Sequence, residues 1–273
     1  MESMEKLHAL ELKIALEIKR ICEKHDIAYF LTAGTLLGAV RHEGFIPWDD
    51  DMDIGMLRCD YERFAEACRQ DLGPEFFFQT WDTDPGFPFS YGKVRLKGTH
   101  MAERFAQDAS TLCDGLFVDV FPFDSVPENA VEERLQALRY YFCKRILWIK
   151  KGMGTSMKSE SLKKRMKYYL FKAFAGLFDY DKVKTYYRNT QKKYNGRKTR
   201  KVVTDGAYAY RKESIERSWT ENLKPVGFEG VQFPAFRDAA DYLSYFYGDY
   251  MTPPPEDKRG GHDLLEIDFG EYA

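Results

Sequence analysis

The chain of 273 residues is long enough for a full hydrophobic core, as one large domain or as one domain with an appended helical lobe. Its composition, 44% hydrophobic and 31% charged, excludes an intrinsically disordered protein. The formal net charge of −2 conceals an uneven distribution, because residues 144–201 contain 19 Lys or Arg and 3 Asp or Glu. This basic stretch indicates a surface for an anionic partner.

Cysteine usage and hydropathy indicate the compartment. The five cysteines are scattered and include no C-x-x-C pair, which favours reduced thiols over a disulfide framework or a zinc site. The N-terminal residues mix charged and apolar side chains, and no run of about 18 apolar residues occurs. We therefore expect neither a signal peptide nor a transmembrane helix, and we predict a cytoplasmic protein.

The first half of the chain alternates helical and strand-like patterns. Residues 4–25 carry apolar side chains at three- or four-residue spacing, which predicts an amphipathic helix. Next come a predicted short strand ending at Gly34, a short helix, a strand and a helix with Asp60 as its N-cap, at residues 27–34, 35–44, 51–57 and 60–71. Further strand-like runs occupy residues 75–81, 89–99 and 115–123. This order predicts an α/β (α+β) fold, a mixed sheet with flanking helices.

The second half begins with a helical, basic pattern. Helices are predicted at residues 130–150, 159–178 and 180–194, followed by strand-like residues 201–236 with a hairpin at 228–236 and a helix at 237–248. We therefore divide the chain into a core (1–127), a basic helical insertion (128–200) and a C-terminal part that returns to the core (201–273).

Four aspartates, at positions 49, 50, 51 and 53, crowd into five positions directly after an apolar, glycine-containing segment. Side chains at i and i+2 of a strand share a face, so Asp51 and Asp53 are predicted to point the same way, with Asp49 extending the row. Adjacent carboxylates suit a hard divalent cation such as Mg2+, which commonly shares its coordination with substrate phosphates. Asp119, a lone acid in the apolar run LFVDVF, is the candidate for a third carboxylate because burying it unpaired would be costly.

Other interpretations of these acids remain open. The aspartates after Pro47-Trp48 could form a solvated loop that caps a helix, and Asp119 could form a structural salt bridge. A calcium loop of the EF-hand type fails, because Ile54 and Asp60 occupy the positions that require Gly and Glu.

Gly34-Thr35 stands where the first predicted strand meets the next helix. A glycine there allows the backbone to approach a phosphate, and the start of a helix offers unpaired N–H groups. Gly-Thr, a short helix and then a strand carrying D-x-D is the local signature of the nucleotidyltransferase fold of the polymerase-beta type.

The stretch GTLLGAVRHEGFIPWDDDMDIG closely resembles the signature of the LicD-type phosphotransferase family, which includes bacterial phosphorylcholine transferases and, more distantly, fukutin-related proteins. YGKVRLKGT, LFVDVFPFD and YLSYFYGDYMTPP also resemble the family, whereas residues 145–200 match it only loosely. The resemblance implies a nucleotidyltransferase-like core. It also implies transfer of a phospho-alcohol, usually phosphocholine, from a CDP-activated donor to a sugar hydroxyl of a glycan, with release of CMP. Such chemistry belongs to lipopolysaccharide or teichoic acid biosynthesis.

By the same resemblance, Asp51 and Asp53 match the metal-binding pair and Asp119 the third acid, so these three are the predicted catalytic and metal-binding residues. The expected ion is Mg2+, with Mn2+ as an alternative. One carboxylate, with Asp119 as the candidate, would accept the proton of the attacking hydroxyl. Asp49 matches an acid of the same motif whose role the sequence leaves open.

Six further residues are candidates for donor binding, each with a structural alternative. Gly34 and Thr35 stand at the helix start. Lys93 and Arg95 share a strand face and could contact phosphates, pair with the aspartates or lie on the surface. Arg41 could contact a phosphate or serve as a charge at a helix C-terminus, and Trp48 could stack on a base or a choline cation or simply pack.

Two rival functions remain at this point. A nucleotidyltransferase would release diphosphate instead of CMP, and a catalytically silent protein would only bind a glycan or a nucleotide. The transferred group stays open among choline, ethanolamine, ribitol, glycerol and phosphonate head groups. The basic helices within 144–201 could touch an anionic membrane carrying a lipid-linked glycan, at its inner face, or could be solvated. No nucleic-acid module is present, so we expect no nucleic-acid partner.

Overall fold

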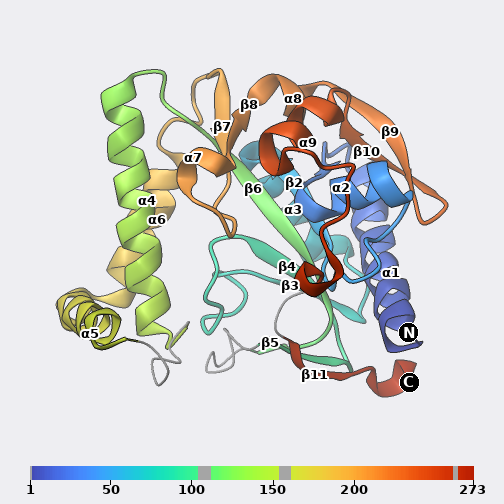
Figure 1. Ribbon diagram of the computed structural model, residues 1–273, viewed down its shortest axis with the longest axis horizontal. Coiled ribbons are helices and arrows are strands. Elements are labelled where there is room, and N and C mark those ends of the chain that lie inside the picture. Colours follow the sequence, from blue (N-terminus) through green and yellow to red (C-terminus); the bar gives the residue numbers. More distant parts are fainter. Residues whose placement is uncertain (1, 104–111, 154–160, 261–263) are drawn as a thin grey trace.

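The computed structural model describes residues 2–103, 112–153, 161–260 and 264–273 (Figure 1). A mixed sheet crosses the middle of the molecule in the strand order β1, β2, β6, β4, β3. Its strands are β1 (Phe30–Leu31), β2 (Asp53–Leu57), β6 (Phe117–Ser125), β4 (Gly92–Leu96) and β3 (Phe76–Gln79). β2 and β6 are parallel, and the other neighbours in this order are antiparallel. The predicted mixed α/β class is confirmed.

Strand β6 joins the two halves of the chain. Its end, at Asp124 and Ser125, pairs with β7 (Lys201–Val203), which in turn pairs with β8 (Ser214–Glu216). Nearly all of β6 is buried, as expected for a central strand covered on both faces. The C-terminal part of the chain therefore returns to the same sheet.

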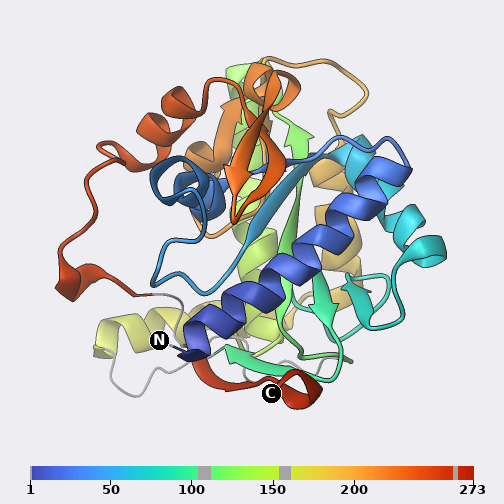
Figure 2. The same cartoon turned by 90° about the vertical axis from the view of Figure 1, so that its right-hand side faces the viewer.

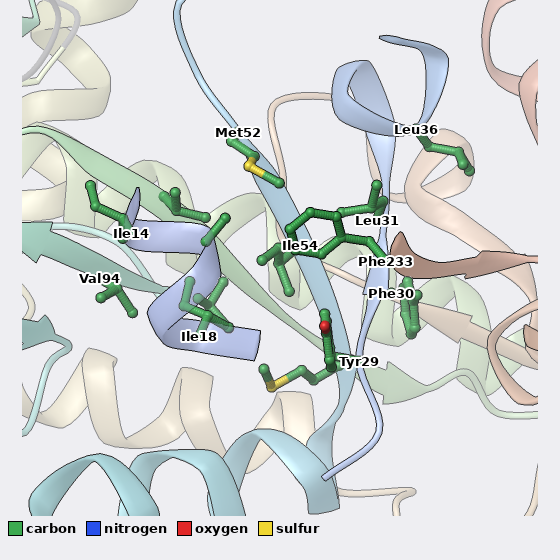
Figure 3. Packing of buried hydrophobic residues seen from close by; sticks show 14 of the residues in the cluster. Ile14, Ile18, Tyr29, Phe30, Leu31, Leu36, Met52, Ile54, Val94 and Phe233 are labelled. Atoms are coloured by element: carbon green, nitrogen blue, oxygen red, sulfur yellow. The ribbon is translucent and has the colours of Figure 1, made fainter. Parts of the chain in front are cut away.

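Helices α1 (Glu2–Lys24) and α3 (Arg58–Asp71) cover one face of the sheet, and α1 runs diagonally across it (Figure 2). The apolar side of α1 is fully buried at Ile14 and Ile18, which lie beside Ile54 and Val94 of the sheet (Figure 3). The amphipathic spacing of α1 thus positions the helix as the periodicity predicts.

Beside β1, at the edge of the sheet, lies the hairpin of β9 (Leu223–Phe228) and β10 (Val231–Phe236). It packs with α2 (Ala33–His42), α8 (Arg217–Glu221) and α9 (Ala239–Tyr247). The hairpin turns at Glu229 and Gly230, which both have positive φ, the geometry of a two-residue turn that matches the strand twist. Phe236 then packs on Phe30 of β1 with a ring distance of 4.8 Å.

A helical lobe stands to one side of the sheet (Figure 1) and consists of α4 (Ala130–Lys150), α5 (Leu162–Gly176) and α6 (Tyr180–Lys192). Asn129 and Asp179 cap α4 and α6 by accepting hydrogen bonds from backbone N–H groups of the first turns. Tyr140, Leu147 and Tyr187 centre a second hydrophobic cluster beneath these helices. The division of the chain into three domains stays a prediction.

The remaining elements lie towards the C-terminus, apart from β5. They are the short helix α7 (Tyr210–Glu213), the single turns η3 (Glu256–Lys258) and η4 (Gly270–Tyr272), and β11 (Leu264–Asp268), which pairs with β5 (His100–Glu103). Among the described residues, no helix combines the length and apolar character that crossing a bilayer requires.

The structure corrects several predicted boundaries near the aspartates. The strand predicted at 27–34 shrinks to β1, because the chain already enters α2 at Ala33. Gly34 and Thr35 therefore lie inside the first turn of α2 and not before it. β2 begins at Asp53, so Asp51 precedes the strand. Asp60 lies in the first turn of α3, whose N-cap is Leu57.

Candidate active site

A cavity of about 460 Å3 lies where the first turn of α2, the start of β2, β6, α7 and α9 meet. Helix α4 reaches it with Trp148, near the C-terminal end of that helix. Four aspartates line the cavity: Asp49, Asp51, Asp53 and Asp119.

Three of these carboxylates converge. Parallel pairing sets Asp53 directly opposite Asp119, so the two side chains leave the same face of the sheet. One carboxylate oxygen each from Asp51, Asp53 and Asp119 lies within 4.8 Å of the other two. The prediction that Asp51 and Asp53 project from one strand is wrong for Asp51, which stands in the segment before β2. The three acids nevertheless come together.

Asp51 also belongs to a second group with Asp49 and Asp50, in which one carboxylate oxygen of each residue lies within 4.8 Å of the other two. Asp50 is 1% exposed and is not among the cavity-lining residues, so the run of acids divides between the cavity and the interior.

The backbone of the acid run is fixed from several sides. The Asp53 N–H donates to Thr35 Oγ1 at 2.7 Å, and the Asp119 N–H donates to the Met52 carbonyl at 2.8 Å. His8 Nε2 of α1 lies 2.8 Å from the Asp49 carbonyl oxygen, a hydrogen bond with the ring N–H as donor. The carboxylates are thus preorganised by the helices and the sheet and do not depend on a free loop.

Lys93 lies next to the three acids. It is opposite Asp119 in the β4–β6 register, 1% exposed, and its Nζ is 3.0 Å from Asp119 Oδ1. Both alternatives for Asp119 are therefore present at once: it lies within the carboxylate cluster and it has a basic partner.

Burial, followed by the charges of Asp51, Asp119 and Asp49, raises the pKa of Asp53 well above its ordinary value, and Lys93 opposes the shift. A divalent cation fits this donor set, because three hard carboxylate oxygens converge and a positive charge would offset their repulsion.

Glu11 on α1 lies behind the acid run and was not predicted. It is fully buried, neither carboxylate oxygen has a hydrogen-bond partner, and burial together with Asp51, Asp50 and Asp49 raises its pKa well above the ordinary value. The sequence does hold a signal for it. Glu11 follows Leu7 by four residues and precedes Ile14 by three, so an acid occupies the apolar face of the helix.

The other predicted donor-binding residues divide into two groups. Gly34 lines the cavity, and a Cβ there would lie 2.9 Å from Asp49 Oδ2, so a side chain at this position would displace that carboxylate. Thr35 is not among the lining residues, but its Oγ1 accepts the hydrogen bond from the Asp53 N–H.

Arg41, Trp48 and Arg95 are not among the cavity-lining residues. Arg41 donates to the Tyr250 carbonyl at 2.8 Å, and Trp48 packs edge-on to His42. Arg95 donates to the Gly115 carbonyl at 2.6 Å and is buried. These contacts correspond to the structural alternatives, and the predicted binding roles of these three residues stay untested.

Aromatic residues form much of the remaining cavity wall. Six of them lie in the stretches that resemble the family, but none was predicted as a site residue. The rings of Phe89 and Tyr91 stack at 4.9 Å, and Tyr91 meets Phe121 at 4.4 Å. The other aromatic lining residues are Phe123, Trp148, Tyr208, Tyr242, Phe246 and Tyr247. Together the nine aromatic residues come from five separate segments of the chain, so no local spacing reveals them.

Glu213 of α7 is a further carboxylate in the cavity wall. Burial raises its pKa to about 7, although the Tyr208 N–H donates to it at 2.8 Å and Lys144 lies nearby. The cavity thus combines an aspartate cluster, an aromatic wall and a separate buried acid.

Comparison with known proteins identifies the domain that carries this site. Residues 26–148 match the family model described as LicD/FKTN/FKRP, nucleotidyltransferase domain. The chain is 28% identical over 254 residues to the lipopolysaccharide cholinephosphotransferase LicD of Haemophilus influenzae, covering 90% of each chain. It is also 42% identical over 52 residues to the human ribitol 5-phosphate transferase FKRP, a local match to 17% of this chain and 10% of FKRP.

The family model covers the strands and loops that supply Asp51, Asp53 and Asp119, and the similarity to LicD extends over nine tenths of both proteins. Residues 26–148 therefore form a LicD-type nucleotidyltransferase domain, within a chain that is similar to LicD along most of its length.

Proposed function

We propose that this protein transfers phosphocholine from CDP-choline to a sugar hydroxyl of a cell-surface glycan and releases CMP. The relatives support the broader reaction, phosphotransfer to a glycan, because LicD is a lipopolysaccharide cholinephosphotransferase and FKRP a ribitol 5-phosphate transferase. We place the reaction in the cytoplasm, at the inner face of the membrane, with a free or lipid-linked glycan as acceptor.

The observation that carries the proposal is the composition of the cavity that Asp51, Asp53 and Asp119 line. One part holds the converging carboxylates of Asp51, Asp53 and Asp119, which suit a divalent cation and therefore a diphosphate. Another part offers aromatic rings and the Glu213 carboxylate, and this combination attracts a quaternary ammonium group. CDP-choline carries both a diphosphate and a quaternary ammonium.

In the proposed reaction, the acceptor hydroxyl oxygen bonds to the phosphorus that carries choline, and the bond from that phosphorus to the CMP oxygen breaks. Asp51, Asp53 and Asp119 would hold Mg2+ or Mn2+, which when bound neutralises charge on the diphosphate. Asp119 is our candidate to accept the hydroxyl proton, and Lys93 holds that carboxylate in place.

Gly34 and the first turn of α2 border the part of the cavity that we assign to the diphosphate of the donor. The absence of a side chain at Gly34 lets the Asp49 carboxylate approach α2 closely, so the helix N-terminus and the acid run enclose one space. Backbone N–H groups at this end are suited to phosphate oxygens.

The test is a thermal-shift panel with CDP-choline, CDP-ethanolamine, CDP-ribitol and CDP-glycerol, each with and without Mg2+. A ligand that binds only the folded protein raises the melting temperature. We expect the largest Mg2+-dependent shift with CDP-choline and no shift in Asp53→Asn. Glu213→Gln should weaken CDP-choline about tenfold and leave CDP-ribitol unchanged, since only the former carries a cation.

Product analysis separates the rivals. Release of CMP supports phospho-alcohol transfer, whereas release of diphosphate would identify a nucleotidyltransferase. Absence of any shift across the panel in the presence of Mg2+ and Mn2+ would overturn the donor assignment and favour a silent binding protein.

A further inference from the structure

Helix α5 exposes an apolar stripe along its whole length. Leu162, Met166, Tyr169, Leu170, Phe174 and the adjoining Leu177 are between 43% and 80% exposed. Their spacings of four, three, one, four and three residues put them on one side of a helix with about 3.6 residues per turn. An exposed stripe of this length on a folded protein indicates a binding surface.

Packing against α4 fixes the direction in which the stripe points. Ala175 of α5 is 1% exposed, and Phe171 stacks on Phe142 of α4 with a ring distance of 6.4 Å. Arg145 of α4 covers the Phe171 ring at 4.9 Å. Because Phe171 and Ala175 occupy the inner side, the stripe faces away from the protein, at the edge of the lobe (Figure 1).

The charges of α5 flank the stripe on both sides. At about 100° per residue, Lys167 lies on one margin with Lys163 just inside it, and Arg165 and Lys172 follow the other margin. Lys164 lies on the inner half, and α5 contains no acidic residue. A stripe of aliphatic and aromatic side chains between two basic margins is the pattern of a helix that lies in a membrane interface.

We propose that α5 docks this protein on an anionic lipid bilayer, with the stripe in the acyl-chain boundary and the basic margins on lipid phosphates. A second copy of the same face fits poorly, because it would oppose two strongly basic helices. A bilayer matches both features at once, since its interior accepts the stripe and its anionic head groups accept the margins.

Docking would bring the cavity to the membrane, a consequence that rests on the proposed function. Helix α4 packs on α5 and also supplies Trp148 to the cavity. A protein held by α5 therefore presents its cavity beside the bilayer, where a lipid-linked glycan acceptor would be found.

The experiment is vesicle flotation of the whole chain without donor or metal. Vesicles of phosphatidylcholine with about 30 mol% phosphatidylglycerol are compared with pure phosphatidylcholine. We expect binding to the anionic vesicles, at least tenfold weaker binding to neutral ones, and loss of binding in about 0.5 M salt. Failure to float with anionic vesicles overturns the proposal.

Two variants separate the contributions of the stripe and its margins. Leu170→Ser with Phe174→Ser should weaken binding at least tenfold without changing the charge. Lys163→Gln with Lys167→Gln should weaken it by about 25-fold, since each basic residue near such a surface contributes about fivefold. The controls are Leu16→Ser, 41% exposed on α1, and Lys198→Gln, an exposed lysine outside α5, which should bind as wild type.

The remaining outcomes also decide the question. Equal binding by wild type and the α5 variants would move the membrane site elsewhere, and self-association that is lost in Leu170→Ser with Phe174→Ser, without vesicle binding, would identify a second copy as the occupant. Either result overturns the proposal. Vesicle binding without a thermal shift for any CDP-alcohol would overturn the proposed function and would still support the docking of α5 on a membrane.

Discussion

The sheet-centred core and the α4–α6 lobe bury their apolar residues in different ways. In the core, α1, the strands and the hairpin enclose one continuous cluster, with Ile14, Ile54 and Phe233 fully buried. In the lobe each helix buries only one side: of the 18 exposed large hydrophobic side chains in the described residues, 13 lie between Val131 and Tyr186. The core therefore buries its apolar side chains against one another, whereas the lobe leaves many apolar side chains exposed.

This difference separates two requirements of the proposed reaction. Carboxylates that hold a cation need positions fixed to within a fraction of an ångström, which paired strands provide for Asp53 and Asp119. Recognition of a large, fluid partner needs an accessible apolar surface and not a rigid pocket, which α5 provides. The two regions meet at Trp148, where the lobe contributes to the cavity wall.

The largest expected effect tests whether chemistry resides in the core. Asp53→Asn should lower kcat by about a thousandfold, because it removes one of three converging carboxylates without changing the shape of the site. Steady-state CMP release measures the effect. Asp181→Asn, an exposed acid on α6 of the lobe, is the matched control and should retain wild-type activity. Comparable losses in both variants would erase the distinction between the two regions.

A buried ion pair at the junction tests how tightly the regions are coupled. Arg58 of α3 donates two hydrogen bonds to Asp124 at the end of β6, at 2.8 and 2.6 Å, and Asn195 after α6 donates a third at 2.6 Å. Asp124→Asn leaves the Arg58 charge buried and should lower the free energy of unfolding by about 3–5 kcal/mol.

Urea unfolding measures this loss of stability. Glu66→Gln breaks the exposed Arg69–Glu66 pair, and its free energy of unfolding should stay close to that of wild type. If Asp124→Asn costs no more than this control, the ion pair at the junction does not couple the core to the lobe.

Glu213 makes a pH-dependent contribution to the cavity wall. Burial raises its folded-state pKa from 4.5 to about 7, so the folded protein retains a proton that the unfolded chain releases. Stability from this group is fully present below pH 4.5 and is lost as the pH rises through about 7. The loss is about 3 kcal/mol for a shift of this size.

The free energy of unfolding should therefore fall more steeply with rising pH in wild type than in Glu213→Gln. Urea unfolding at pH 5 and pH 8 should show wild type losing about 2.5 kcal/mol more than the variant across this interval. Parallel stability profiles would mean that burial does not raise the pKa of Glu213 in the folded protein.

Local patterns predicted most of the core and the central acids. The apolar spacing of α1 and the lone acid in LFVDVF each report a periodicity, and periodicity follows from which face of an element is buried. The alternation of D-x-D indicated that Asp51 and Asp53 converge, although Asp51 precedes β2 and does not lie on it. Boundaries were less predictable. β1 ends early and Ala33 adopts a positive φ at the start of α2, because Tyr242 of α9, more than 200 residues away, accepts the Ala33 N–H through its hydroxyl oxygen.

The cavity wall could not be predicted for a related reason. Tyr208 and Glu213 meet the aspartates only after β7 and β8 bring the C-terminal part back to the sheet, and Trp148 reaches the cavity from the lobe. Single residues of this kind carry no spacing that marks them. The basic composition of 144–201 did indicate an anionic partner, but only the packing of α5 on α4 shows which side of that helix faces outwards.

The smallest expected effect concerns the stability of the lobe itself. Leu170→Ser changes a side chain that is 66% exposed, so the free energy of unfolding should change by less than about 0.5 kcal/mol. Leu147→Ala removes a side chain that is 1% exposed in the lobe cluster and should cost about 2–5 kcal/mol. If Leu170→Ser leaves the free energy of unfolding unchanged, the apolar stripe does not stabilise the fold, and we infer that it contacts a partner. A loss above about 1 kcal/mol in Leu170→Ser, measured by urea unfolding, would instead assign the stripe to the internal packing of the lobe.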